Sequence, residues 1–196
     1  MHSPIDVIKD IPFTSDHLKN YLSKINSMID KLRSLNDDRA LVIVAALFVE
    51  KAIDDYLSSL IPDFLKIEDE RDMTFSLKIK LASSFKLCHS SFFKCSHKIR
   101  EIRNEFAHNI EIERINDLDS SYLISLQTHC KNWGHEEEIK DLDFIDIFQH
   151  VSKTIILNLM MRVHVNNIMT RYIRTKQFKQ NFLNYISQLD PNSLSF

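Results

Sequence analysis

Glycine is almost absent from this chain, which has one glycine, Gly134, and four prolines among its 196 residues. Hairpins and β-sandwiches need such turn residues often, so their scarcity argues against an all-β fold. A single glycine also excludes the glycine-rich phosphate loops of the Walker and Rossmann motifs. The long runs rich in Leu, Ile, Lys and Glu instead favour helices joined by short polar connections.

The chain also has few cysteines and a small net charge. The three cysteines, Cys88, Cys95 and Cys130, are an odd number, and no signal peptide is recognisable before them. We therefore expect a reducing, cytoplasmic location. The net charge of −2 provides no overall basic field for nucleic acid. No window approaches about 18 consecutive apolar residues, so no contact with a membrane is expected.

Apolar residues recur at helical spacing along most of the chain. The spacing predicts helices at about 15–32, 38–61, 74–87, 90–108 and 142–175. A short helix at 120–130 and a last segment at 178–189, which packs back on the bundle or reaches a partner, are further expectations. Residues 1–14 are predicted to be an irregular lead-in, and the charged stretches 63–73 and 134–138 to be loops. The chain thus predicts an all-α fold, one bundle of about five to six helices with a long C-terminal helix. The domain would span 15–196, with 120–196 as a helical extension of the bundle.

The hexapeptide Arg103-Asn104-Glu105-Phe106-Ala107-His108 ends the predicted helix at 90–108. Asn104 and His108 are four residues apart and share one helical face, whereas Arg103 lies about 140° around the helix from His108. Histidine titrates near neutral pH and can transfer protons. Arginine carries a permanent forked charge that suits phosphate oxygens. The hexapeptide is therefore a candidate site for phosphate chemistry.

Basic residues continue along the same predicted helix, at Lys94, Lys98 and Arg100, with Glu101 and Glu105 opposing them. This modest basic stripe suits a nucleic-acid backbone, and we expect these three residues to contact RNA if the site is catalytic.

Three segments in order resemble the HEPN superfamily, and within it the mannitol operon repressor family. They are the run from Asn36 to Val44 and on to Glu50, the run from Thr74 to Ala82, and the run from Ile99 to His108, which ends in the Arg-x4-His motif. The resemblance covers roughly residues 36–110. It implies a helical bundle that forms a homodimer, with the two motifs facing each other across a cleft.

The resemblance also implies two alternative functions. In active HEPN ribonucleases the Arg and His act without a metal or other cofactor, and the RNA 2′-OH attacks its own phosphate. Carried over, His108 transfers the proton, Arg103 stabilises the charge on phosphorus, and Asn104 orients the histidine or the RNA. The protein would then be a toxin or phage-defence effector, with an antitoxin as a possible partner. The alternative is a non-catalytic transcriptional regulator that resembles the mannitol repressor and acts through protein partners.

Two charged residues, Arg39 and Glu50, lie on an otherwise apolar stripe of the predicted helix at 38–61. A buried charge is costly unless it is paired. Glu50 is expected either to make a structural pair, with Arg39 across an interface or with Arg103, or to orient Arg103 for catalysis. Arg103 tied to Glu50 in the core, with His108 covered, would favour the regulator.

Metal binding is not expected. The spacing of Cys88, Cys95 and His97 is not that of a zinc finger, and Cys95 falls on an apolar seam. His129, Cys130 and His135 are scattered around the predicted loop at 134–138. Cys130 beside a histidine would suggest a thiol nucleophile, but no residue is placed to orient the base.

Overall fold

The computed structural model describes residues 37–71 and 73–173, with the isolated residues 23, 27, 30, 31, 34, 35, 180, 181 and 184. Within this part of the chain lie seven α-helices, one 3-10 helix and no strand, which confirms the all-α fold and the long C-terminal helix. Two of the helices are short. Three predicted segments lie outside these two continuous ranges. They are the lead-in at 1–14, the helix at 15–32 and the last segment at 178–189.

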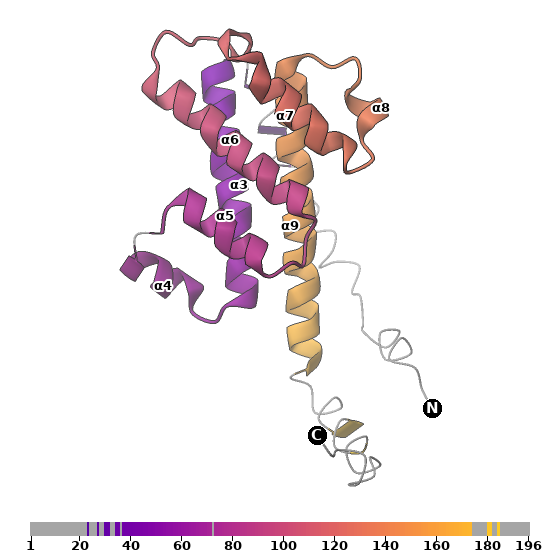
Figure 1. Ribbon diagram of the computed structural model, residues 1–196. Helices are drawn as coiled ribbons and strands as arrows, with labels where there is room; N and C mark the ends of the chain where they lie inside the picture. Colours follow the sequence, from indigo (N-terminus) through magenta and orange to yellow (C-terminus); the bar gives the residue numbers. More distant parts are fainter. Residues whose placement is uncertain are drawn as a thin grey trace.

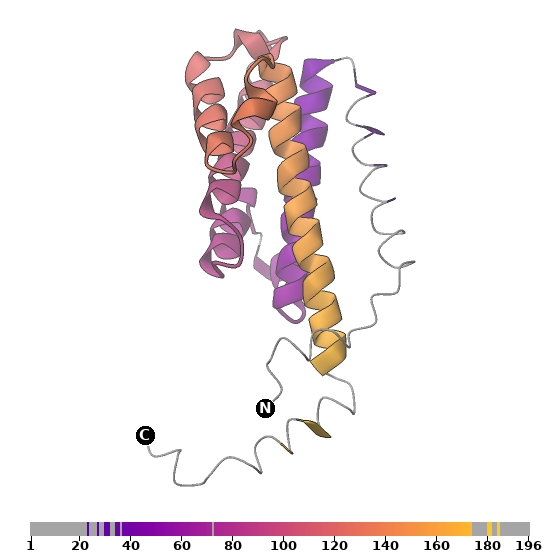
Figure 2. The same ribbon diagram turned by 90° about the vertical axis from the view of Figure 1, so that its right-hand side faces the viewer.

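The helices form two layers. In the first layer, α3 (Asp38–Leu60) and α9 (Phe144–Ile173) lie side by side and run in the same direction, as Figure 2 shows. In the second layer, α5 (Phe75–Ser84), α6 (Ser90–His108) and α7 (Ser120–Lys131) cover one side of this pair (Figure 1). The core between the layers includes the fully buried Ile53, Ile99 and Phe148.

Local signals set the bounds of α3. The Asp37 carboxylate accepts a hydrogen bond from the Ala40 N–H at 2.8 Å and so caps the first turn. The helix ends at Leu60, two residues before Pro62, which disfavours helical geometry in the residue that precedes it. The helix as a whole is packed on several sides, because α5, α6 and α9 all contact it.

The seam predicted for α6 is largely buried. Cys95, Ile99, Ile102 and Phe106 are fully buried, while Phe92 is half-buried and Phe93 lies in the core instead. Of the polar residues between them, Ser96 is also buried, whereas Lys94 is exposed. None of the helices in the described ranges combines the length and the apolar character that a bilayer span requires.

Two predicted loops are wrong, because each contains a short helix. α4 (Phe64–Arg71) lies within 63–73, where Asp63 has a positive φ of 56° and Phe64 is buried at 2 % exposure. α8 (Glu136–Ile139) lies within the acidic stretch, and its Ile139 is also 2 % exposed. In both cases one apolar anchor fixes a charged segment against the core, which composition alone did not reveal.

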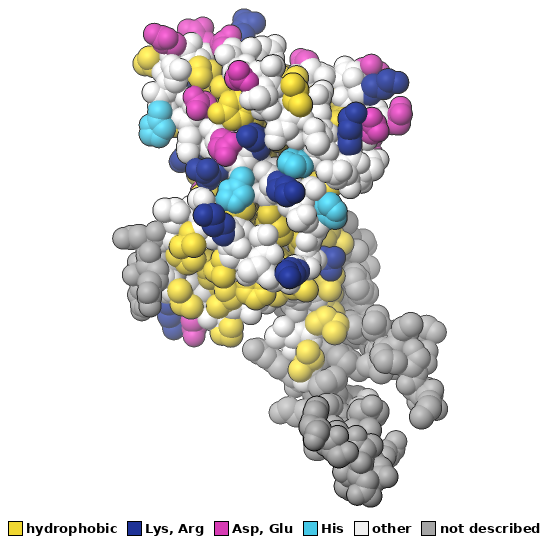
Figure 3. All heavy atoms as spheres, viewed as in Figure 1, with side chains coloured by type: hydrophobic (Ala, Val, Ile, Leu, Met, Phe, Trp, Pro, Cys, Tyr) yellow, Lys and Arg dark blue, Asp and Glu magenta, His cyan; other side chains and the backbone are white. Residues whose placement is uncertain are grey.

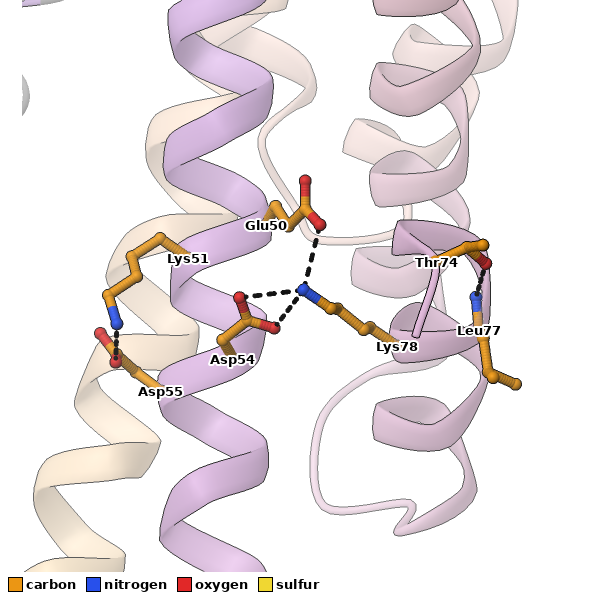
Figure 4. A network of polar contacts seen from close by, with 7 residues as sticks. All are labelled: Glu50, Lys51, Asp54, Asp55, Thr74, Leu77 and Lys78. Atoms are coloured by element: carbon orange, nitrogen blue, oxygen red, sulfur yellow. Dashed lines mark hydrogen bonds and ion pairs between the residues drawn. The ribbon is translucent and has the colours of Figure 1, made fainter. Parts of the chain in front are cut away.

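A buried lysine joins the two layers (Figure 4). Lys78 on α5 points between two carboxylates of α3, with its Nζ 3.1 Å from Glu50 Oε1 and 3.2 Å from Asp54 Oδ2. The Lys78 side chain is only 6 % exposed. A buried ion cluster of this kind adds little net stability compared with apolar packing, but removing one member leaves the others uncompensated.

We expect Lys78→Met to destabilise the fold by about 3 kcal/mol, because Glu50 and Asp54 would remain as two like charges on one half-buried face of α3. The measurement is the free energy of unfolding in urea. Lys66→Met is the matched control, since Lys66 pairs with Asp63 at 3.3 Å on the surface and both side chains are more than 70 % exposed. Equal loss of stability in the two variants would contradict the role of Lys78 as the buried partner of Glu50 and Asp54.

Candidate functional site

The motif Arg103–His108 forms the C-terminal end of α6. Arg103 and Asn104 are half-buried, whereas His108 is exposed in the last turn of the helix. Ile102 and Phe106, which flank these positions, are fully buried and fix the rotation of the helix against the core. The sequence therefore places the polar residues of the motif on the accessible side of α6.

The Arg103 guanidinium is held by its own neighbour in the sequence. Its Nη1 donates a hydrogen bond to Asn104 Oδ1 at 3.1 Å. Within the described part of the chain, Arg103 forms no ion pair with a carboxylate. An arginine oriented by an amide keeps its full charge and further N–H donors for a phosphate.

Glu50 is not the partner of Arg103. The structure pairs it with Lys78, and the expected ion pair of Glu50 with Arg103 is not among the contacts of either residue. The pairing differs from the prediction because the tertiary packing of α5 against α3 brings the Lys78 ammonium to Glu50. Glu50 thus has a structural pairing within the bundle, with a different cation from the two that the sequence suggested.

Arg39, at the start of α3, binds the backbone at the end of α6. Its guanidinium donates to the carbonyl oxygen of Phe106 and, at 2.6 Å, to that of Ile112. Two longer bonds, both 3.3 Å, reach the carbonyls of Asn109 and Ile110. The last carbonyls of a helix have no partner within it, and a cation there is also favoured by the helix dipole. Arg39 thus fixes the backbone on both sides of His108.

The three residues expected to contact RNA differ in their surroundings. Lys94 is exposed. Lys98 pairs with Glu101 at 2.6 Å and lies 5.0 Å from the centre of the Tyr122 ring, and Arg100 is 3.9 Å from Glu101. Glu101 therefore partly neutralises two of the three cations. Lys94 is the one of the three whose charge remains fully available to a phosphate.

Two histidines beside the stripe report a positive environment. Burial lowers the pKa of His97, and the charges of Arg100 and Lys80 lower it further against the opposing effect of Glu101. Burial likewise lowers the pKa of His129, with added contributions from the nearby charges of Lys94 and Lys98.

Lys, Arg and His side chains gather across the middle of this face of the molecule (Figure 3). Sequence reasoning missed the contributions of Lys80 and His129, because they belong to α5 and α7 and join the α6 stripe only in the folded chain.

An open pocket of about 650 Å³ lies elsewhere, where α3 and α9 begin. Its walls include four carboxylates, which outnumber the two arginines Arg39 and Arg114, and no residue of the motif lines it. The carboxylates are those of Asp37, Asp38, Glu113 and Asp143. A site so rich in carboxylates is unsuited to a phosphate group. The candidate site is therefore the open surface of α6 and not this pocket.

Comparison of the chain with models of known protein families, with curated proteins and with solved structures finds no match. Function is therefore inferred from the residues of the site.

We expect Arg39→Ala to lower the free energy of unfolding by about 2 kcal/mol, because it leaves several carbonyls at the end of α6 without a donor. Arg39→Lys should lose less, since it retains the charge but cannot reach all four carbonyls. Urea denaturation gives both values, and amide hydrogen exchange should show faster opening at residues 106–112. An Arg39→Ala variant as stable as the unmodified protein would contradict the capping role.

Proposed function

We propose that this protein is a metal-independent endoribonuclease of the HEPN type, with Arg103, Asn104 and His108 at the reacting phosphate. The observation that carries the proposal is the accessibility of the motif. His108 is exposed, and Arg103 is oriented by Asn104 and is not bound to a carboxylate of the described chain.

The motif supplies the base and the cation that the reaction needs, and solvent supplies the proton for the leaving oxygen. His108 takes the proton from the RNA 2′-OH, whose oxygen then attacks the adjacent phosphorus. Arg103 donates to the non-bridging oxygens, which carry more negative charge in the transition state than in the substrate. The bond from phosphorus to the 5′-oxygen breaks, and that oxygen leaves with a proton from solvent. The products are a 2′,3′-cyclic phosphate and a 5′-OH end.

The contacts of Glu50 and the exposure of His108 support the nuclease over the regulator. A purely structural motif would have Arg103 held by Glu50 and His108 covered. Instead, Glu50 binds Lys78, and His108 is open to solvent. The neighbouring basic residues, above all the exposed Lys94, offer a path for the RNA backbone.

We further propose that the protein acts as a homodimer through its motif-bearing face. Ile110, two residues after His108, is 86 % exposed, the highest value among the exposed large apolar side chains of the described residues. A second copy placed against this surface would cover Ile110 and bring the two motifs together. Each site could then combine Arg103 of one subunit with His108 of the other, which suits their different directions on α6.

Purified protein incubated with total RNA in EDTA should cleave it, and His108→Ala should reduce the rate by at least about 100-fold, because proton transfer typically contributes this much. His89→Asn is the matched control. His89 is exposed at the opposite end of α6, where its side chain caps the helix by accepting from the Ser91 N–H, and asparagine can keep that cap.

No cleavage by the unmodified protein, or equal cleavage by His108→Ala, would overturn the nuclease proposal. Absence of cleavage together with stable capture of a protein partner would favour the regulator instead.

The dimer can be tested by mixing two inactive variants. Arg103→Ala retains His108, and His108→Ala retains Arg103, so a heterodimer of the two contains one complete site if each site draws on both subunits. Random exchange should restore about a quarter of the original rate, since half of the dimers are mixed and each has one of two sites. Recovery of no activity, with exchange verified by native mass spectrometry, would place each site within one subunit.

A further inference from the structure

Three side chains that take no part in the proposed RNA site converge at the junction of α8 and α9. They are His135, which precedes α8, Glu138 within α8, and His150 on α9. One ligand atom from each lies within 4.8 Å of the other two. His135 Nδ1 is 2.9 Å from Glu138 Oε2, and His150 Nε2 is 3.6 Å from the same oxygen.

Two of the three separations are near those between ligands of a tetrahedral zinc ion, and the third, between the two imidazole nitrogens, is within 4.8 Å. Ligand atoms at 2.0–2.2 Å from Zn²⁺ lie about 3.4 Å from one another at tetrahedral angles. The two contacts with Glu138 Oε2 fall on either side of this value, so small side-chain rotations would place all three atoms around one ion. Two imidazole nitrogens and one carboxylate are also a donor set that zinc accepts, with water in the fourth position.

The surrounding packing holds the three residues in place. Ile139, next to Glu138, is 2 % exposed and anchors α8 to the core. The His135 ring packs edge-to-face against Trp133, with ring centres 6.4 Å apart. His150 lies on α9, and the next residue of that helix, Val151, is fully buried. Glu138 and His150 are therefore carried by helices, and His135 by the short turn between α7 and α8.

His150 has an additional feature that points to a ligand. Its Nε2 is shielded from solvent and has no hydrogen-bond partner among the described residues, although it faces Glu138. A buried polar atom without a partner is costly. A bound cation would satisfy this nitrogen, and the two imidazoles are near enough to share one ion, since their ring centres are 5.3 Å apart.

The protonation states of the cluster suit a metal. The hydrogen bond from His135 lowers the pKa of Glu138, so the carboxylate is ionised at neutral pH. Burial, with a contribution from the neighbouring His135, lowers the pKa of His150 and favours its neutral form, although Glu138 opposes this. Metal binding requires deprotonated ligands of this kind. Lys153 is the nearby cation that opposes a bound metal.

We propose that His135, Glu138 and His150 form a binding site for a divalent transition-metal ion, with zinc as the favoured occupant. The ion would fasten α8 and the turn before it to α9. The site is separate from Arg103 and His108, and the cleavage reaction does not pass through it.

Titration of metal-free protein with Zn²⁺ by calorimetry should show one ion bound per chain, and Co²⁺ should give the visible absorption of a tetrahedral site. Glu138→Gln and His135→Ala should each weaken zinc binding by more than about 100-fold, since loss of a ligand costs at least as much as loss of its supporting contacts. Glu138 is exposed, so its replacement leaves the core intact even if a change at His150 impairs folding.

His89→Asn and Cys88→Ser are the controls, because they remove a surface imidazole and a half-buried thiol that lie outside the cluster. Both should bind zinc as the unmodified protein does. Zinc should also slow amide hydrogen exchange in residues 135–150. Absence of stoichiometric binding at micromolar zinc, or equal binding by Glu138→Gln, would overturn the site. Neither result depends on whether the protein cleaves RNA.

Discussion

The contact of Arg39 with the end of α6 is the constraint on which the arrangement of the motif depends. One guanidinium joins the first turn of α3 to the carbonyls of Phe106, Asn109, Ile110 and Ile112. It thereby fixes where α6 ends and where the chain turns, and His108 lies between these anchored points. A long helix packed only through its apolar seam would leave its last turn to fray. The Arg39 contact holds this last turn, and with it the backbone of His108, in one position.

The ion pairs of the bundle determine which cation is left for a substrate. Lys78 neutralises Glu50 and Asp54 within the fold, and Glu101 neutralises much of Lys98. Among the described residues, Arg103 is in contrast oriented by the Asn104 amide and pairs with no carboxylate. The carboxylates of the bundle are thus paired with lysines and not with Arg103, so the arginine of the motif keeps its capacity to bind an anion. This division between structural and available charge is the physical basis of the proposed RNA chemistry.

Periodicity predicted the main helices well, because α3, α6 and α9 carry long apolar stripes. They failed at α4 and α8, where a single buried residue, Phe64 or Ile139, holds a charged segment in helical form. The motif could be found from sequence because its residues are local. The partner of Glu50 could not, since Lys78 lies 28 residues further on. The cluster of His135, Glu138 and His150 was missed for the same reason, because it exists only where α8 meets α9.

The most direct test of the central claim is the chemistry of the RNA ends left by the purified protein in EDTA. Attack by the neighbouring 2′-oxygen predicts a 2′,3′-cyclic phosphate on one product and a 5′-OH on the other, and no cutting of a substrate in which the 2′-OH at the cleaved position is replaced by hydrogen. Products with a 5′-phosphate, or equal cutting of the deoxy-substituted substrate, would mean that water is the nucleophile and would contradict the roles assigned to Arg103 and His108.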